Sequence, residues 1–196
     1  MGRLVTARSV NRGKSIFSGP SDAQWLSSCI RKMDAYNVDT TIVDGALSST
    51  SHASPAITQC MILTTGAAVS TNLQQLIKKT KFQYELLKIP VAASGISEKI
   101  SGNERGIYAV DDTRNIIQLN ISSAFFIEKH REDLFRYGSV LYFTGMVTDK
   151  VLNFLKFQNN IREITIIVRD FTCLFITPEV LNEYKKMGGK IFVLYN

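Results

Sequence analysis

The sequence contains few of the residues that build disulfide-stapled or metal-bound proteins. It has only three cysteines and two histidines among 196 residues. Cys29, Cys60 and Cys173 are odd in number and widely spaced, with no CxxC pair, so neither a disulfide scaffold nor a structural zinc site is expected. Each cysteine has apolar neighbours, and we expect free, buried thiols in a reducing compartment.

Long hydrophobic runs are also absent. No stretch approaches the roughly 18 apolar residues of a membrane-spanning helix. The N-terminus lacks the apolar core of a signal peptide. These two absences predict a cytoplasmic protein with no membrane partner.

The sequence also lacks two well-known motifs, the phosphate loop and the Gly-x-Ser-x-Gly elbow of hydrolases. Gly13-Lys14-Ser15 resembles the end of a phosphate loop, but the complete motif needs another glycine where Arg8 stands. The triplet also precedes the first expected strand, whereas a phosphate loop follows a strand. No Gly-x-Ser-x-Gly elbow occurs, so a hydrolase of that type is not expected. The sequence therefore contains no intact phosphate loop.

Positive charge is concentrated at the start of the chain. The 23 basic residues exceed the 17 acidic residues by six. Arg3, Arg8, Arg12 and Lys14 all precede the first acidic residue, Asp22. Nucleic-acid surfaces interleave such charges with aromatic side chains, which are nearly absent here. We therefore interpret this segment as a solvated terminus, and no nucleic-acid partner is expected.

Short apolar runs alternate with helical patterns over much of the sequence. With 45% hydrophobic and 20% charged residues, the composition is that of a globular protein. Most of the apolar runs are continuous rather than alternating, which is typical of strands buried on both faces of a parallel sheet. The expected strands are residues 15–18, 40–43, 61–64, 139–143, 164–168 and 190–194.

Four helices are expected between these strands, because apolar residues recur at helical spacing after a capping residue or a proline. They are a helix capped by Asp22, a helix capped by Ser70 or Thr71 and ended by Pro90, residues 149–157, and a helix opened by Pro178. Strand–helix alternation predicts an α/β fold, mainly a parallel sheet with flanking helices in a Rossmann-like three-layer arrangement.

The middle of the chain breaks this pattern. Residues 107–110 and 115–119 flank a four-residue turn, which predicts a β-hairpin. We interpret residues 91–137 as an irregular, hairpin-containing insert or linker. It separates a first α/β half, residues 1–90, from a second half, residues 138–196, within one compact domain.

Small and acidic residues follow five of the expected strands. In an open parallel sheet, ligands bind beyond the carboxyl ends of the strands, where glycine lets backbone amides approach an anion. An Asp after a buried strand can also hold Mg²⁺, and Asp44 is the candidate metal ligand. The alternative is that these residues serve only tight turns. The candidate ligand-binding residues at the strand ends are Gly19, Ser21, Asp22, Asp44, Gly45, Thr65, Gly66, Thr144, Gly145 and Asp170.

A run of hydroxyl side chains, residues 48–54, follows Asp44 and contains Ser51 and His52. It is a solvated loop or a substrate-binding segment in which His52 acts as an acid or base. Two further functional classes follow. The chain is a small-molecule-binding protein or enzyme using a crevice around Gly19, Asp44 and Gly66, or a structural protein whose strand ends are only turns. His130 lies in a charged segment that is typical of a surface helix.

Three stretches of the first half resemble one known family. They are Gly19-Pro20-Ser21, Ile42-Val43-Asp44-Gly45-Ala46-Leu47 and Leu63-Thr64-Thr65-Gly66-Ala67. These stretches look like the small reactivase subunit associated with lysine 5,6-aminomutase, a cobalamin-dependent enzyme of amino-acid fermentation. Residues 165–170, 175–176 and 189–195 are also similar, so the resemblance covers most of the chain.

The resemblance implies a nucleotide-linked accessory protein that acts with a second, ATPase subunit and with the aminomutase. It implies ATP and Mg²⁺ as cofactors, with Asp44 matching the Asp that faces Mg²⁺ and nucleotide. Members of the family carry an N-terminal phosphate loop and continue past the last strand, whereas this chain has neither and is interpreted as a fragment of a longer protein. Ser49 stands where a basic residue is expected, which weakens anion binding.

Overall fold

A computed structural model of the chain describes residues 5–14, 19, 23–44, 57–93, 96, 105–157 and 163–194. The chain divides into two compact units, residues 1–61 and 62–196. In the first unit, the described residues form the helix α1 (Ala23–Met33) and a short 3-10 helix, η1 (Asp34–Tyr36). Asn37 ends η1 in the left-handed conformation, with φ of 55°.

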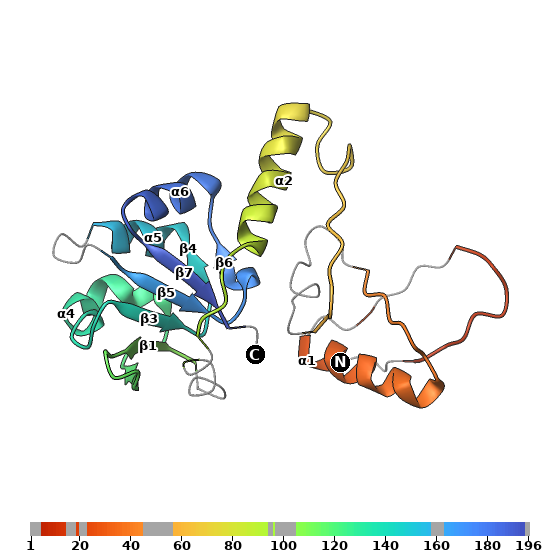
Figure 1. Cartoon of the computed structure of the whole chain (residues 1–196), viewed down its shortest axis with the longest axis horizontal. Coiled ribbons are helices and arrows are strands. Elements are labelled where there is room, and N and C mark those ends of the chain that lie inside the picture. Colours follow the sequence, from red (N-terminus) through yellow and green to blue (C-terminus); the bar gives the residue numbers. More distant parts are fainter. Residues whose placement is uncertain are drawn as a thin grey trace. The chain divides into compact units, whose positions relative to one another are not determined.

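The second unit is built on a five-stranded mixed sheet in the order β2-β1-β3-β5-β7 (Figure 1). Strands β3, β5 and β7 run parallel to one another, whereas β1 pairs antiparallel with both β2 and β3. A second, two-stranded parallel sheet pairs β4 with β6. The strands are β1 (Ile107–Val110), β2 (Ile116–Leu119), β3 (Val140–Phe143), β4 (Val147–Thr148), β5 (Thr165–Val168), β6 (Leu174–Phe175) and β7 (Lys190–Val193).

Helices of the second unit precede the β1–β2 hairpin, follow it, and connect the parallel strands. Helix α5 lies between β3 and β5 in sequence, and α6 lies between β5 and β7, which gives two consecutive βαβ units. The helices are α2 (Leu73–Leu87), η3 (Ala124–His130), α4 (Arg131–Leu134), α5 (Asp149–Lys156), η4 (Phe171–Cys173) and α6 (Pro178–Lys186). Within the described residues, no helix has the length and apolar character needed to cross a bilayer.

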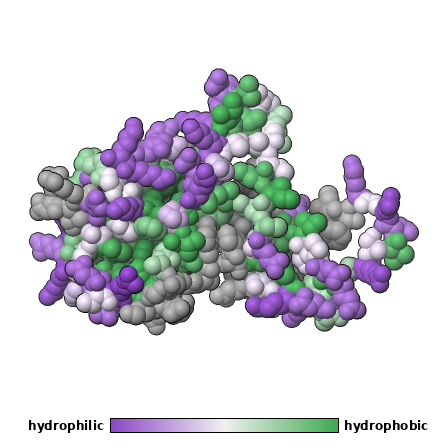
Figure 2. Space-filling view, viewed as in Figure 1, coloured by the Kyte–Doolittle hydropathy of each residue, from purple (hydrophilic) through white to green (hydrophobic). Residues whose placement is uncertain are grey.

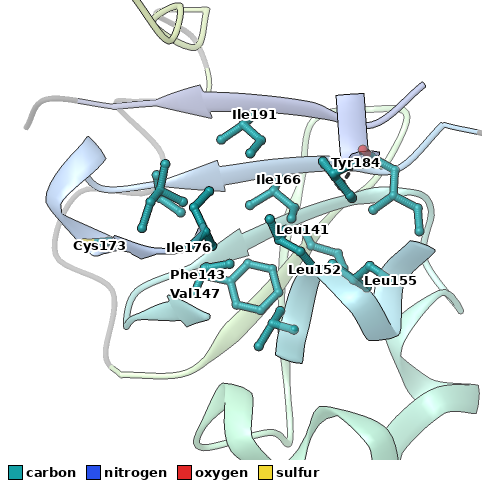
Figure 3. Close-up of a cluster of buried hydrophobic side chains, with 14 of the residues drawn as sticks. Leu141, Phe143, Val147, Leu152, Leu155, Ile166, Cys173, Ile176, Tyr184 and Ile191 are labelled. Atoms are coloured by element: carbon teal, nitrogen blue, oxygen red, sulfur yellow. Dashed lines mark hydrogen bonds between the residues drawn. The ribbon is translucent and has the colours of Figure 1, made fainter. Parts of the chain in front are cut away.

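The main core lies between one face of the sheet and helices α5 and α6 (Figure 3). Alternate strand residues such as Leu141, Phe143 and Ile166 point into it and meet Leu152 and Leu155 of α5. The other face is buried too, because Tyr108, Tyr142 and Ile167 form a second cluster with Ala92 and Leu194. Burial on both faces explains the continuous apolar runs of β3 and β5.

The α/β class predicted from the sequence is confirmed, and so are its last three strands. The expected hairpin forms as β1 and β2, and because β1 pairs with β3 it supplies two strands of the main sheet. Helices α1, α2, α5 and α6 lie where they were expected. The predicted caps of α2 were wrong, since Asn72 accepts a hydrogen bond from the backbone of Gln75 at 3.1 Å.

Two predicted strands were wrong, and the expected strand at residues 15–18 lies outside the described residues. Residues 40–43 and 61–64 have no strand structure. Ile42 and Ile62 in these segments are 87% and 86% exposed. An apolar run becomes a strand only when neighbouring strands pair with it, and propensity alone does not supply that pairing.

The predicted burial of the cysteines is confirmed for one of the three. Cys173 is buried in the main core, whereas Cys29 is half-buried and Cys60 is exposed. The prediction was therefore wrong for Cys60, which lies in a segment without regular structure although its sequence neighbours are apolar. All three cysteines are free thiols.

Candidate functional site

The polar residues predicted in the second half lie together at the carboxyl edge of the parallel strands. Phe143 at the end of β3 pairs with Val168 at the end of β5. The residues that follow therefore leave the sheet side by side. We call Thr144, Gly145, Arg169 and Asp170 the strand-end cluster.

Thr144 ties the end of β3 to the start of β1. Its hydroxyl accepts a hydrogen bond from the backbone N–H of Gly106 at 2.8 Å and donates one to the Gly106 carbonyl at 3.0 Å. The backbone N–H of Thr144 also donates to that carbonyl. Gly106 has a φ of +156°, and a Cβ there would lie 3.4 Å from the Ile121 carbonyl oxygen. The Thr144 side chain is thus already used within the fold.

Asp170 is the one charged residue that is buried among the described residues, at 5% exposure. Its carboxylate caps the 3-10 helix η4 by accepting a hydrogen bond from the backbone N–H of Thr172 at 2.8 Å and another from the Thr172 hydroxyl. A carboxylate at this position satisfies donors that would otherwise be lost at the start of a helix. Asp170 therefore acts first as a structural cap.

Arg169 is the member of the cluster whose charge reaches solvent. Its Nε lies 3.3 Å from Oδ2 of Asp170, and Nη2 lies 4.0 Å from Sγ of Cys173. The Arg169 side chain remains 57% exposed despite these contacts. Burial raises the pKa of the neighbouring Tyr142 phenol, and the Arg169 charge opposes that rise. Buried partners therefore orient a guanidinium whose outer side is open.

Beyond the cluster, the two βα connections pair with each other. Each contains a two-residue strand, and Val147 and Thr148 of β4 pair with Leu174 and Phe175 of β6. The Asp149 carboxylate at the start of α5 accepts a hydrogen bond from the backbone N–H of Thr177 at 2.8 Å. These contacts hold the connections that bear Gly145 and Arg169 in a fixed relation.

The chemistry available at this edge is anion binding. A guanidinium binds a phosphoryl or carboxylate group through paired hydrogen bonds. Gly145 stands in open space, since a Cβ there would meet nothing within 4 Å. Among the described residues, no group of three His, Cys, Asp or Glu side chains converges as a metal site would require.

The candidate residues of the predicted first half, residues 1–90, belong to two different compact units. Gly19 and Asp44 belong to the first unit, where both are exposed. In the second unit, the Thr65 hydroxyl shares a hydrogen bond with the Thr80 hydroxyl at 2.8 Å, and the Gly66 carbonyl accepts one from Val69. Ser21, Asp22, Gly45, Ser51 and His52 lie outside the described residues. The grouping of Gly19, Asp44 and Gly66 stays a prediction.

Two grooves are found on the second unit. One, of about 610 Å³, is lined by Glu128 and Arg131 together with Lys150 and Phe157 of the α5 region. The other, of about 460 Å³, lies along α2. Neither groove is lined by a residue of the strand-end cluster.

The strand-end pattern of the sequence predicts Thr144, Gly145 and Asp170, but not Arg169, as ligand-binding residues. The available signal was a basic residue directly after a buried apolar strand, at the edge where ligands of parallel sheets bind. The pairing of β4 with β6 also went unpredicted, because two-residue strands have no recognisable pattern.

No family model, no curated protein and no solved structure matches the chain.

Proposed function

We propose that this chain is a nucleotide-associated accessory protein of the reactivase type, which acts in the cytoplasm with an ATPase subunit and a cobalamin-dependent aminomutase. The observation that carries the nucleotide part is Arg169, an oriented and half-exposed guanidinium at the carboxyl edge of β3 and β5. The link to an aminomutase rests on the sequence resemblance, whose stretches include residues 165–170 on this same edge.

The residues present suit a phosphoryl group better than a firmly held Mg²⁺. Arg169 offers paired donors, and the open space at Gly145 leaves room for a ligand atom close to the backbone. Mg²⁺ needs carboxylate oxygens, and Asp44 is the candidate that the resemblance supplies.

Isothermal titration of the protein with ATP and Mg²⁺ tests the proposal. We expect heat of binding and an upward thermal shift at millimolar nucleotide. Arg169→Gln should weaken the affinity at least tenfold, because the guanidinium supplies the charge-assisted hydrogen bonds.

Arg136→Gln is the matched control, because it precedes β3 and so removes the same charge from the opposite edge of the sheet. Circular dichroism verifies that both arginine variants remain folded. The absence of heat and of a thermal shift with the wild-type protein would contradict the nucleotide part. Equal losses in Arg169→Gln and Arg136→Gln would show that only bulk charge matters.

A further inference from the structure

Helix α2 presents a hydrophobic stripe that the second unit leaves largely uncovered. Leu73, Ile77 and Tyr84 are 66%, 53% and 51% exposed. They recur at helical spacing, so they lie on one face of the helix. The helix packs on the core only through its C-terminal part, where Phe82 and Leu87 are partly buried against the core and Leu86 and the following Ile89 are buried in it. Figure 2 shows hydrophobic surface on α2 where it stands out from the sheet.

A groove runs along this stripe. Leu63 and Thr65 line one side, and Leu76, Ile77, Thr80 and Tyr84 of α2 line the other. The hydrogen bond between the Thr65 and Thr80 hydroxyls at 2.8 Å holds the extended segment against the helix. Leu63 is 45% exposed. The groove, of about 460 Å³, therefore has an apolar floor, and both of its walls belong to the second unit.

The rim of this groove is positively charged. Lys81 lines it, and Nζ of Lys88 lies 4.7 Å above the centre of the Tyr84 ring. Glu85, the acidic residue of α2, pairs with Lys185 of α6 at 3.8 Å. Among the described residues that line the groove, none carries a carboxylate. An occupant must therefore combine apolar side chains with negative charge.

We propose that the α2 groove, formed by Leu63, Thr65 and the Leu76–Tyr84 face of α2, docks an amphipathic helix of another protein whose apolar stripe is flanked by carboxylates. A helix fits because the stripe on α2 offers ridges at i, i+3 and i+4 spacing for a second helix. A second copy of this chain that docks through the same face is disfavoured, because that face supplies Lys81 and, among its described lining residues, no carboxylate. The proposal is independent of nucleotide binding.

Fluorescence anisotropy with synthetic peptides tests the proposal. The probe is a labelled amphipathic peptide of about 18 residues with Leu on one face and Glu beside it. A matched peptide carries Lys in place of Glu. The full chain should bind the Glu peptide at least tenfold more tightly than the Lys peptide, and added salt should reduce this preference.

Variants assign the binding to the groove. Ile77→Ser should abolish binding, whereas Met187→Ser, which removes another exposed apolar side chain, should leave it unchanged. Lys81→Glu should reverse the preference between the two peptides. Thermal unfolding verifies that the variants remain folded.

Three results would overturn the proposal. The first is no binding of either peptide, or equal binding of both. The second is self-association in sedimentation that Ile77→Ser abolishes, since the occupant would then be a second copy. The third is a loss of stability in Ile77→Ser as large as that of a core truncation, since the stripe would then be buried within the chain.

Discussion

Tyr184 is buried in the core and also forms a hydrogen bond with the backbone of Ile164, the residue before β5. Its ring is 2% exposed, and its hydroxyl donates to the Ile164 carbonyl at 2.8 Å (Figure 3). That carbonyl also accepts a hydrogen bond from the backbone N–H of Lys190 at 3.0 Å. Burial raises the pKa of the Tyr184 phenol well above its ordinary value of 10.0. The phenol is thus held in its neutral form.

Replacing Tyr184 by Phe should lower the free energy of unfolding by about 1 kcal/mol, because one hydrogen bond is lost while the Ile164 carbonyl keeps its other donor. Stability should also depend differently on pH. In the unfolded chain the phenol ionises near pH 10, whereas in the folded protein it stays neutral, so the wild type loses stability as the pH rises above 10.

Urea unfolding of both proteins between pH 8 and 11 measures this difference. Above pH 10, the wild type should lose up to about 1.4 kcal/mol per pH unit more than Tyr184→Phe. Tyr142 and Cys173, whose pKa values burial also raises, remain in both proteins and cancel in the comparison. Parallel pH profiles for the two proteins would contradict the assignment.

Gly189 and Gly145 are predicted to respond oppositely to alanine. A Cβ at Gly189 would clash with the buried Tyr184 ring, whereas one at Gly145 would meet nothing within 4 Å. Gly189→Ala should therefore cost about 1–3 kcal/mol, as overpacking of a core does. Gly145→Ala should leave stability within about 0.5 kcal/mol but weaken nucleotide binding. Denaturant midpoints and calorimetry measure the two effects, and a destabilised Gly145→Ala variant would refute the open geometry.

At the scale of the element, η4 depends on its cap. Asp170→Ala removes the acceptor for the N–H and the hydroxyl of Thr172, and the variant should lose about 1–2 kcal/mol. Arg169→Gln, one residue away, keeps the cap and should lose less than about 0.5 kcal/mol. Chemical denaturation of the two variants measures the difference. Equal losses would show that Arg169 is structural, which would remove the basis for its proposed role in binding.

Elements were predictable where local signals and burial agreed. Helix α6 begins at Pro178 and stops before Gly188-Gly189, and the apolar run of β5 is buried on both faces. Residues 40–43 and 61–64 carry equally apolar runs but form no strand, since strand formation depends on pairing that a linear pattern does not encode. For the same reason, the sequence did not predict that the hairpin pairs with β3.

The positions of the candidate site residues were more predictable than their roles. Strand-end logic located Thr144, Gly145 and Asp170 on one edge, because parallel strands end together. The sequence did not show that Thr144 forms hydrogen bonds with the backbone of Gly106 or that Asp170 caps η4. Both roles depend on backbone donors at the turns. The suitability of Arg169 as an anion ligand likewise became evident only from its contacts with Asp170 and Cys173 and from the exposure of its side chain.

At the scale of the whole molecule, the described buried core belongs to the second unit. Its buried hydrophobic residues extend from Leu86 to Leu194. A chain of residues 62–196 should therefore retain a cooperative unfolding transition with a similar change in circular dichroism. Thermal unfolding of the shortened chain and of the full chain, followed by circular dichroism, tests whether the cooperative transition is retained. A shortened chain without a cooperative transition would show that residues 1–61 belong to the same core.

The claim that nucleotide binds at the carboxyl edge of β3 and β5 is tested most directly by NMR titration of the full, nitrogen-15-labelled chain with ATP and Mg²⁺. We expect the largest shifts of amide signals at Gly145 and Arg169, and Arg169→Gln should abolish them. Shifts confined to other residues, or a spectrum unchanged at millimolar nucleotide, would contradict it.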